Sequence, residues 1–335
     1  MNTRALLGCL ALVVIGLLLW ELRWVLLVLF GAVVLAVALD VPVTQLRRRL
    51  PLNRPTALAL VLAVLGWKVS ELLLPELVQQ ANEFTQLVPV LIQRLGALAG
   101  QFRGLQTLEE QLLDLGSWDR LQPLGSQLLG VAGSTANTTI QMLLMGLLAV
   151  LFALDPRSHQ RLLIAATPRF YRPTMQGLLH DCRQALGGWL AGMTISAVTV
   201  FVLTWAGLAL LKVPLALLSG LVCGLLTFVP TIGPTVATLL PMAVALLISP
   251  AKVVQVLILR LLLQNVEAFV LTPVLLSRTV NLLPTVALMA QLSLGALLGL
   301  PGVLLGLPLV VVIQVVCQRV LVEQIMDRWT LPGGG

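Results

Sequence analysis

The chain has 335 residues and a formal net charge of +7; 58% of its residues are hydrophobic and 10% are charged. This composition, with helix-length apolar runs recurring from Ala5 to Val316, predicts an all-α, polytopic integral membrane protein whose first partner is the lipid bilayer. The positive charge does not indicate nucleic-acid binding, because the arginines form short clusters between apolar runs and few aromatic side chains could stack on bases.

The apolar runs predict where the membrane segments lie. Single helices are expected near residues 5–20, 24–39, 55–74, 131–154, 185–211 and 252–276. Two further tracts, 214–249 and 284–316, are too long for one crossing of roughly 20 residues and rather short for two. We expect these tracts to be helical hairpins or broken helices, which gives about eight membrane segments.

Clusters of arginine predict the orientation of the chain. One cluster follows the second apolar run and another follows the fourth: Arg47, Arg48, Arg49 and Arg54, then Arg157, Arg161, Arg169, Arg172 and Arg183. Short loops rich in Lys and Arg face the cytoplasm. Both loops and both termini are therefore predicted to be cytoplasmic, with the protein in the cell (inner) membrane.

The layout divides the chain into six expected segments. They are three N-terminal membrane helices (1–74), an amphipathic segment on the outer face (75–130), a fourth membrane helix with a basic cytoplasmic loop (131–184), a helix plus a first broken hairpin (185–249), a helix plus a second broken hairpin (250–318), and a cytoplasmic tail (319–335). A unit of three passes changes orientation when it is repeated. Residues 185–249 and 252–316 are therefore predicted to form an inverted repeat, the architecture in which transporters place broken helices around a binding site.

Two polar segments have more than one interpretation. Residues 75–130 carry acidic residues among leucines at three- and four-residue spacing, which predicts an amphipathic helix that is either a lid, a partner-binding surface or a connector covering the helices below it. The loop 155–183 is expected to hold a short amphipathic helix whose basic residues face anionic lipid headgroups.

The stretch FVPTIGPTVATLLP, Phe228–Pro241, predicts the break in the first hairpin. Unpaired backbone groups cost several kcal/mol each in hydrocarbon, so protein or water must cover such a break. It is either a cavity wall or a tight turn in which Gly233 lets two short helices approach. The residues predicted to form the two breaks are Pro230, Gly233, Pro234, Pro241, Pro301 and Gly302.

Polar residues on the seventh helix are the strongest candidates for function. Arg260, Gln264 and Glu267 are spaced by four and three residues and should share one helix face. A carboxylate near the bilayer centre must face protein or water, where it could carry a proton, bind Na⁺ or bind a polar solute. It could instead form a structural ion pair with Arg260, or a hydrogen bond to a hairpin backbone group that the proline break frees. With Thr231 these three residues are the candidate substrate or ion pathway, and Pro273 and Pro284 are expected to kink the flanking helices.

Several of these stretches together resemble one family. FVPTIGPTVATLLP, QNVEAFVLTPVLLSRTVNLLP and LGALLGLPGVLLGLPLVVV, with DVPVTQLRRRLPLNRPTALAL and LFALDPRSHQRLLIAATP upstream, are similar to the autoinducer-2 exporter (AI-2E) family over nearly the whole chain. The resemblance implies an eight-helix-type transporter whose members export the furanosyl quorum signal autoinducer-2 or exchange Na⁺ for H⁺. It assigns Pro230, Gly233 and Pro234 to the hairpin motif, Gln264 and Glu267 to the polar helix motif, and Pro273 and Pro284 to the flanking prolines.

The chain departs from the family pattern at two places. Thr231 stands where many members have Tyr, and Gly188-Trp189 stands where many have a Gly-Gln pair. A hydrophilic substrate of the autoinducer type would lose polar partners at both places.

Three functions remain open on the sequence. The first is a secondary, ATP-independent exporter of a small solute; the second is a cation/proton antiporter that uses Glu267; the third is a non-transporting membrane scaffold. No enzyme activity, cofactor or metal is expected, because the four cysteines lack ligand spacing and both histidines lie in the cytoplasmic loop. The expected partners are the bilayer and a small-molecule or cation substrate, and further copies of the chain are an open candidate.

Overall fold

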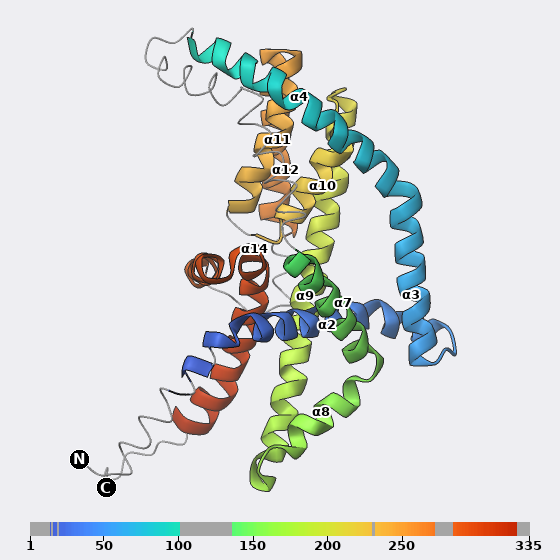
Figure 1. Cartoon of the computed structure of the whole chain (residues 1–335), viewed down its shortest axis with the longest axis vertical. Helices are drawn as coiled ribbons and strands as arrows, with labels where there is room; N and C mark the ends of the chain where they lie inside the picture. Colours follow the sequence, from blue (N-terminus) through green and yellow to red (C-terminus); the bar gives the residue numbers. More distant parts are fainter. Residues whose placement is uncertain are drawn as a thin grey trace, which may run out of the picture. The chain divides into compact units, whose positions relative to one another are not determined.

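The computed structural model describes residues 14, 16–18, 20–100, 136–229, 232–271 and 284–326, and within these ranges every regular element is a helix (Figure 1). The expected all-α fold is confirmed. The chain divides into two compact units. Unit 1 comprises Met1–Thr44, Ile140–Leu186 and Thr285–Gly335, and unit 2 comprises Gln45–Thr139 and Gly187–Pro284.

Long apolar helices confirm the multi-pass membrane fold. Three are long and apolar enough to cross a bilayer: Arg23–Arg49, Arg169–Leu210 and Pro301–Gln324. Two bent helix pairs raise the number to as many as five, and three shorter apolar helices accompany them, at Ala216–Leu226, Gly233–Ile248 and Thr285–Gly299. These are counts for the described residues, and the expected helix near 5–20 lies mostly outside them.

Two helices extend beyond their apolar runs. Helix α2 (Arg23–Arg49) continues through Pro42 and the first arginine cluster, and α9 (Arg172–Leu210) begins well before the expected start at 185. The expected loop 155–183 is therefore mostly helical. It contains α8 (Pro156–Ala165), the short 3-10 turn η2 (Arg169–Tyr171) and the first turns of α9.

Unit 1 is built around close contacts between helices that are far apart in sequence. It contains most of α2, α7 (Ala136–Leu154), α8, the start of α9, α14 (Pro284–Val316) and the terminal π-helix η4 (Cys317–Met326). A Cβ atom added to Gly31 of α2 would lie 2.5 Å from Sδ of Met145 and 3.0 Å from Cδ1 of Leu305. Gly31 thus lets α2 pack directly on both α7 and α14.

Unit 2 has a continuous apolar core. It contains α3 (Arg54–Lys68), η1 (Val69–Leu73), α4 (Leu74–Gly100), the later part of α9, α10 (Ala216–Leu226), α11 (Ile232–Ile248), α12 (Pro250–Val266) and η3 (Glu267–Leu271). The core residues are Leu208, Val213, Leu215, Val244, Ala245 and Val256. Because they come from α9, α11, α12 and the loop between α9 and α10, burying them holds these helices together.

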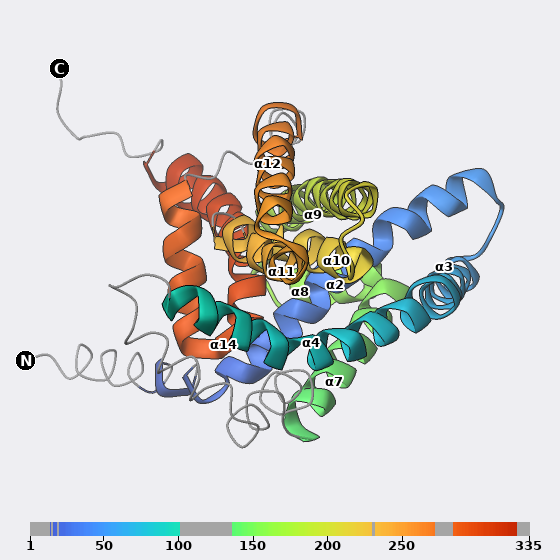
Figure 2. The same ribbon diagram turned by 90° about the horizontal axis from the view of Figure 1, so that it is seen from above.

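Helix α4 covers one end of this core, as Figures 1 and 2 show. Its Phe84 and Leu87 pack against the core residues. Two polar contacts fix it there: Gln80 Oε1 accepts a hydrogen bond from the Leu218 backbone N–H at 2.9 Å, and Arg94 Nη1 donates to the Leu247 carbonyl at 2.6 Å. In the described residues, the first part of the amphipathic segment expected at 75–130 is thus helical and packs on the other helices of unit 2. Its role as a lid, a partner-binding surface or a connector stays a prediction.

Both interrupted tracts fold back as hairpins. We call α10 with α11 the first hairpin, and the two arms of α14 the second. Gly299 has φ 65° and ψ −149°, a conformation that favours glycine, and it separates the arm Thr285–Gly299 from the arm that begins at Pro301. In each turn a glycine sits against a leucine carbonyl: a Cβ on Gly233 would overlap Leu226 O, and a Cβ on Gly302 would overlap Leu294 O.

The two hairpins share their internal register. Cys223, three residues before Leu226, lies opposite Ala237, four residues after Gly233. In the second hairpin Gln291, three residues before Leu294, lies opposite Gly306, four residues after Gly302. The repeat of a hairpin is thus visible in the contacts, and its inverted orientation stays a prediction.

One predicted break residue was wrong. Pro241 lies inside α11, where the helix continues to Ile248. A proline has no N–H to give to the carbonyl four residues earlier, here that of Ala237. The thiol of Cys223 takes its place, donating to Ala237 O at 3.4 Å, so the helix loses little at this point. Pro284 and Pro301 begin the two arms of α14, whereas Pro230, Thr231 and Pro273 lie outside the described residues.

Candidate functional site

Helix α12 carries the polar residues that the sequence singles out. Its start is well defined, because Ser249 Oγ accepts from the Lys252 backbone N–H at 3.2 Å and Pro250 occupies the first turn. The helix ends at Val266 and changes to a π-helix at Glu267. Such changes of helix type are frequent at functional sites.

Arg260 is buried, with 5% of its surface exposed. Each guanidinium nitrogen donates one hydrogen bond, and all three acceptors are neutral. Nε donates to Thr238 Oγ1 at 3.3 Å, Nη1 to Thr204 Oγ1 at 3.2 Å and Nη2 to the Pro234 carbonyl at 3.3 Å. Because Thr204 lies on α9 and the other two on α11, the guanidinium joins three helices around the first hairpin.

Burying this charge is costly. An ionised side chain in an apolar interior loses its hydration, and neutral acceptors replace only part of it. A guanidinium has five N–H groups, so the three hydrogen bonds above leave two further donors. The contact with Pro234 shows that Arg260, a side chain of α12, bonds the backbone at the hairpin. The alternative in which Glu267 does so stays a prediction.

Glu267 faces α9. Ser196 Oγ donates to Glu267 Oε1 at 3.4 Å, a long hydrogen bond, and Ser196 itself is 5% exposed. Two more contacts join these helices, between Arg260 and Thr204 and between Leu259 and Gly207. From Glu267 to Leu259 the residue numbers fall along α12, while those of the contacted residues rise along α9. Helices α9 and α12 are therefore antiparallel neighbours, and their seam holds a cation about two helical turns from a carboxylate.

The other candidates are distributed differently. The Gln264 side chain is exposed, so α9 covers the face of α12 that holds Arg260 but leaves this amide uncovered. Thr231 lies outside the described residues. Trp189, at the position where the family often has a polar residue, is buried.

Sequence periodicity did not find the hydroxyl groups that contact Arg260 and Glu267. Ser196, Thr204 and Thr238 all lie within apolar helices far from Arg260 or Glu267 in sequence. A weak signal exists, because small polar residues in membrane helices commonly bond across helix interfaces. Gln291, 1% exposed in the second hairpin, was also missed.

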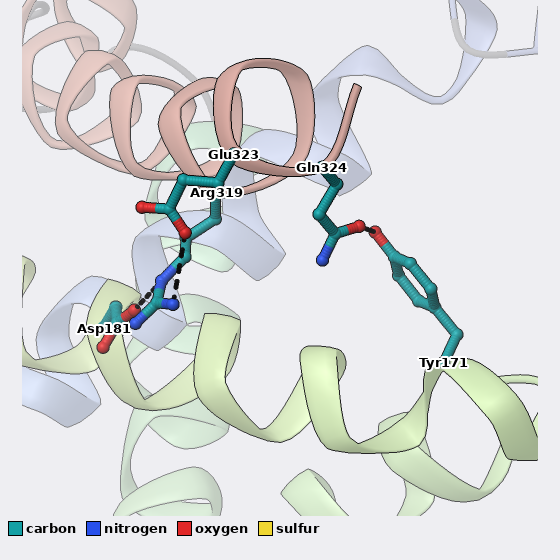
Figure 3. A network of polar contacts seen from close by, with 5 residues as sticks. All are labelled: Tyr171, Asp181, Arg319, Glu323 and Gln324. Carbon is teal, nitrogen blue, oxygen red and sulfur yellow. Dashed lines mark hydrogen bonds and ion pairs between the residues drawn. The ribbon is translucent and has the colours of Figure 1, made fainter. Parts of the chain in front are cut away.

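A separate polar network in unit 1 joins η4 to η2 and to the first part of α9 (Figure 3). Arg319 Nε donates to Asp181 at 2.6 Å, and its Nη1 donates to Glu323 at 3.3 Å. One turn on, the hydroxyl of Tyr171 donates to Gln324 Oε1 at 2.8 Å. Arg183 forms an ion pair with Asp40 of α2. At least this one of the loop's arginines, expected to face lipid headgroups, is thus committed to a protein carboxylate.

Comparisons with known proteins agree with the membrane-transport reading. YrrI of Bacillus subtilis (strain 168), described as a transport protein, is 28% identical over 149 residues, 44% of this chain and 42% of YrrI. The chain thus spans less than half of that relative. YhhT of Escherichia coli (strain K12), also described as a transport protein, is 26% identical over 292 residues, 85% of this chain and 81% of YhhT.

A relative with a more specific name is the AI-2 transport protein TqsA of Escherichia coli (strain K12), 26% identical over 270 residues, 78% of this chain and 74% of TqsA. The sequence profile described as AI-2E family transporter matches residues 7–321. With several apolar helices and this match over nearly its whole length, the chain belongs to the AI-2E family of membrane transporters.

Proposed function

We propose that this chain is a secondary transporter that exports a small solute from the cytoplasm, and that Glu267 couples export to ion movement. The observation that carries the proposal is the α9–α12 seam, where a buried Arg260 and a half-buried Glu267 lie on one helix of an apolar unit. Ionisable residues within membrane helices are costly, and by default they mark ion or substrate pathways.

The two charged residues are suited to different roles. Arg260 is held by three hydrogen bonds from three different nitrogens, so its charge is fixed in place. It stabilises the negative form of a carboxylate two turns away, since charges interact strongly where water is scarce. Glu267 is half-buried, and its Oε1 accepts a hydrogen bond from the Ser196 hydroxyl at 3.4 Å. A half-buried carboxylate can exchange a proton as the helices around it move.

The solute is proposed from the comparisons. The name of TqsA assigns it AI-2 transport, and its similarity to this chain makes autoinducer-2 the first solute to test. The sequence contains no GxxxxGK[ST] loop, so an ion gradient is the proposed source of energy. The arginines at the end of α2 favour cytoplasmic termini in an inner membrane.

The test measures efflux from proteoliposomes. Vesicles containing the native chain are loaded with autoinducer-2, and its release is followed with and without an imposed proton gradient. Glu267→Gln keeps the size and hydrogen-bonding shape of the side chain but cannot ionise, so we expect gradient-driven release to fall by about tenfold or more, the change that a loss of roughly 1.4 kcal/mol produces. The matched control is Glu71→Gln, an exposed carboxylate in η1, which should release at the native rate. Equal rates for native and Glu267→Gln vesicles would refute the role of Glu267.

A cation/proton antiporter is the second candidate, and one feature favours it. Glu267 and Ser196 bring a carboxylate and a hydroxyl oxygen together, and both are hard oxygen ligands of the kind that alkali and alkaline-earth cations prefer. With one carboxylate, the proton and cation would compete for the same oxygens. Na⁺ or Li⁺ uptake that depends on pH, occurs without solute, and disappears in Glu267→Gln would support this candidate. A membrane scaffold would give neither efflux nor uptake.

A further inference from the structure

The second hairpin contains a buried amide that has no hydrogen-bond partner in the described part of the chain. Gln291, on the first arm of α14, is 1% exposed. Neither its Nε2 nor its Oε1 has a hydrogen-bond partner among the described residues. A glutamine amide offers two donors and two acceptor sites. Leaving them unpaired inside protein is unfavourable, whereas a leucine of similar size would carry no such penalty.

The stem of Gln291 lies against a glycine of the second arm. Gly306 lies opposite on the second arm, and a Cβ there would be 3.4 Å from Gln291 Cα and 3.6 Å from Gln291 Cγ. The two arms approach closely at the turn, where Gly302 touches the Leu294 carbonyl. The second arm thus places a residue without a side chain against the Cα and Cγ atoms of Gln291.

The first hairpin has no amide at the corresponding place. Cys223 occupies the corresponding position in the first hairpin, where its thiol donates to the Ala237 carbonyl. The first hairpin therefore fills this position with a small residue whose only polar group has a partner. The second keeps a larger polar side chain whose groups have none in the described part of the chain. A requirement other than packing explains that difference best.

The surroundings of Gln291 select the charge of what it binds. In unit 1, no charged residue occurs in α2 between Arg23 and Asp40, anywhere in α7, or in α14 from Pro284 to Val316. A charged ligand would find no opposite charge on these helices, and burying it would be strongly unfavourable. An amide donates and accepts at once, so its natural complement is a group that does the same, such as a hydroxyl or a hydroxyl beside a carbonyl.

We propose that Gln291 binds the transported solute, and that this solute is uncharged and carries hydroxyl groups. The proposal rests on the transport function proposed above and specifies its substrate class. Because Gln291 is almost completely covered, the structure is closed around it, and the solute reaches the amide only when the packing around the second hairpin opens. Coupling by Glu267 and recognition by Gln291 then belong to different units of the chain.

The experiment uses full-length chain in proteoliposomes loaded with a ¹³C-labelled bacterial metabolite extract, and mass spectrometry identifies what is released. We expect the native chain to release uncharged, hydroxyl-bearing solutes. Gln291→Leu should lower that release by about tenfold or more, because a solute hydroxyl would then be buried without its partner. Ser293→Ala, which removes an exposed hydroxyl from the same arm, should leave release unchanged.

Thermal unfolding of the same variants separates solute binding from a structural role. If the amide has no partner within the protein, Gln291→Leu leaves Tm unchanged or raises it. Gln291→Met, which preserves the unbranched stem, provides a second variant if the leucine variant fails to fold. A lower Tm in both variants would show that Gln291 stabilises the fold, and would overturn the proposal.

The transport outcomes are equally decisive. Native release by Gln291→Leu, or release of charged solutes alone, would overturn the assignment while leaving Glu267 and secondary transport intact. Failure of the native chain to release any solute would refute the proposed export itself. That result is distinguishable, because it appears before any variant is compared.

Discussion

The turns of both hairpins should be intolerant of a single added methyl group. In the first hairpin a Cβ on Gly233 would overlap the Leu226 carbonyl oxygen and lie 2.8 Å from the carbonyl carbon; in the second, a Cβ on Gly302 would overlap the Leu294 oxygen and lie 2.7 Å from its carbon. Ordinary contact begins at 3.4 Å. Gly→Ala at either position therefore forces the arms apart by at least about 0.6 Å, since backbone atoms cannot rotate away as a side chain can.

The expected cost follows from two opposing terms. Overpacking a close contact typically costs about 1–3 kcal/mol, and a clash with backbone belongs at the upper end of that range. Alanine is more favourable than glycine inside a helix by at most about 1 kcal/mol. The overpacking term is larger, so both variants should be less stable by about 1–2 kcal/mol.

Matched controls isolate the contact from the change in helix propensity. Gly66 in unit 2 and Gly146 in unit 1 have no atom within 4 Å of an added Cβ. Gly66→Ala and Gly146→Ala should therefore show only the helix-propensity gain. Tm would be followed by intrinsic tryptophan fluorescence in detergent, with all variants heated at one rate because unfolding of such proteins is often irreversible. A Tm for Gly233→Ala or Gly302→Ala equal to that of its control would refute the close-packed turns.

Three further predictions test the seam and the polar ends of the helices. Thr204→Val should cost about 1–3 kcal/mol because it leaves Arg260 Nη1 buried without its acceptor, whereas Thr199→Val on the exposed side of α9 should change Tm little. The coupling energy between Asp181 and Arg319 in a double-mutant cycle should be about 0–1 kcal/mol and should shrink in high salt, because both side chains are partly exposed. Hydrogen bonds from the Ser158 side chain and backbone lower the pKa of Asp155, the N-cap of α8, which lies beyond the end of α7. The ionised Asp155 should therefore stabilise α8 above about pH 4, and this stabilisation should be lost as the pH falls through the lowered pKa. Amide hydrogen exchange in α8 should show that loss in the native chain and no such pH step in Asp155→Ala.

Much of the fold could be predicted because membrane helices are encoded locally. Length and hydropathy of the runs located α2, α7 and α9, and the length of the two interrupted tracts predicted both hairpins. Gly233 and Gly302 marked the turns for a physical reason, since each lets a backbone carbonyl approach closely. Gly299, which adopts the positive φ in the second turn, was not among the predicted residues. Pro241 was misread because proline alone does not break a helix when another donor serves the freed carbonyl, and that donor comes from Cys223 on a different helix.

The candidate site was only partly predictable for the same reason. The identity of Arg260 and Glu267 as unusual residues is visible in the sequence, because a charge in an apolar run is rare. Their partners are not visible, since Thr204 is 56 residues from Arg260 and Ser196 is 71 residues from Glu267. Helical spacing placed Gln264 on the same face, yet which flank of that face becomes buried depends on where α9 lies.

The contrast between the two hairpins explains why a charge is tolerated in one and an amide is kept in the other. Arg260 can be buried beside the first hairpin because α9 and α11 supply two hydroxyls and the Pro234 carbonyl as acceptors. At Gln291 no acceptor or donor is within hydrogen-bonding distance in the described residues. An ionised side chain there would be buried without compensation, so a neutral amide is among the most polar groups the second hairpin can hold. If the solute is recognised there, its own hydroxyls must supply the missing hydrogen bonds, and the same argument that forbids a charge on the protein forbids one on the solute.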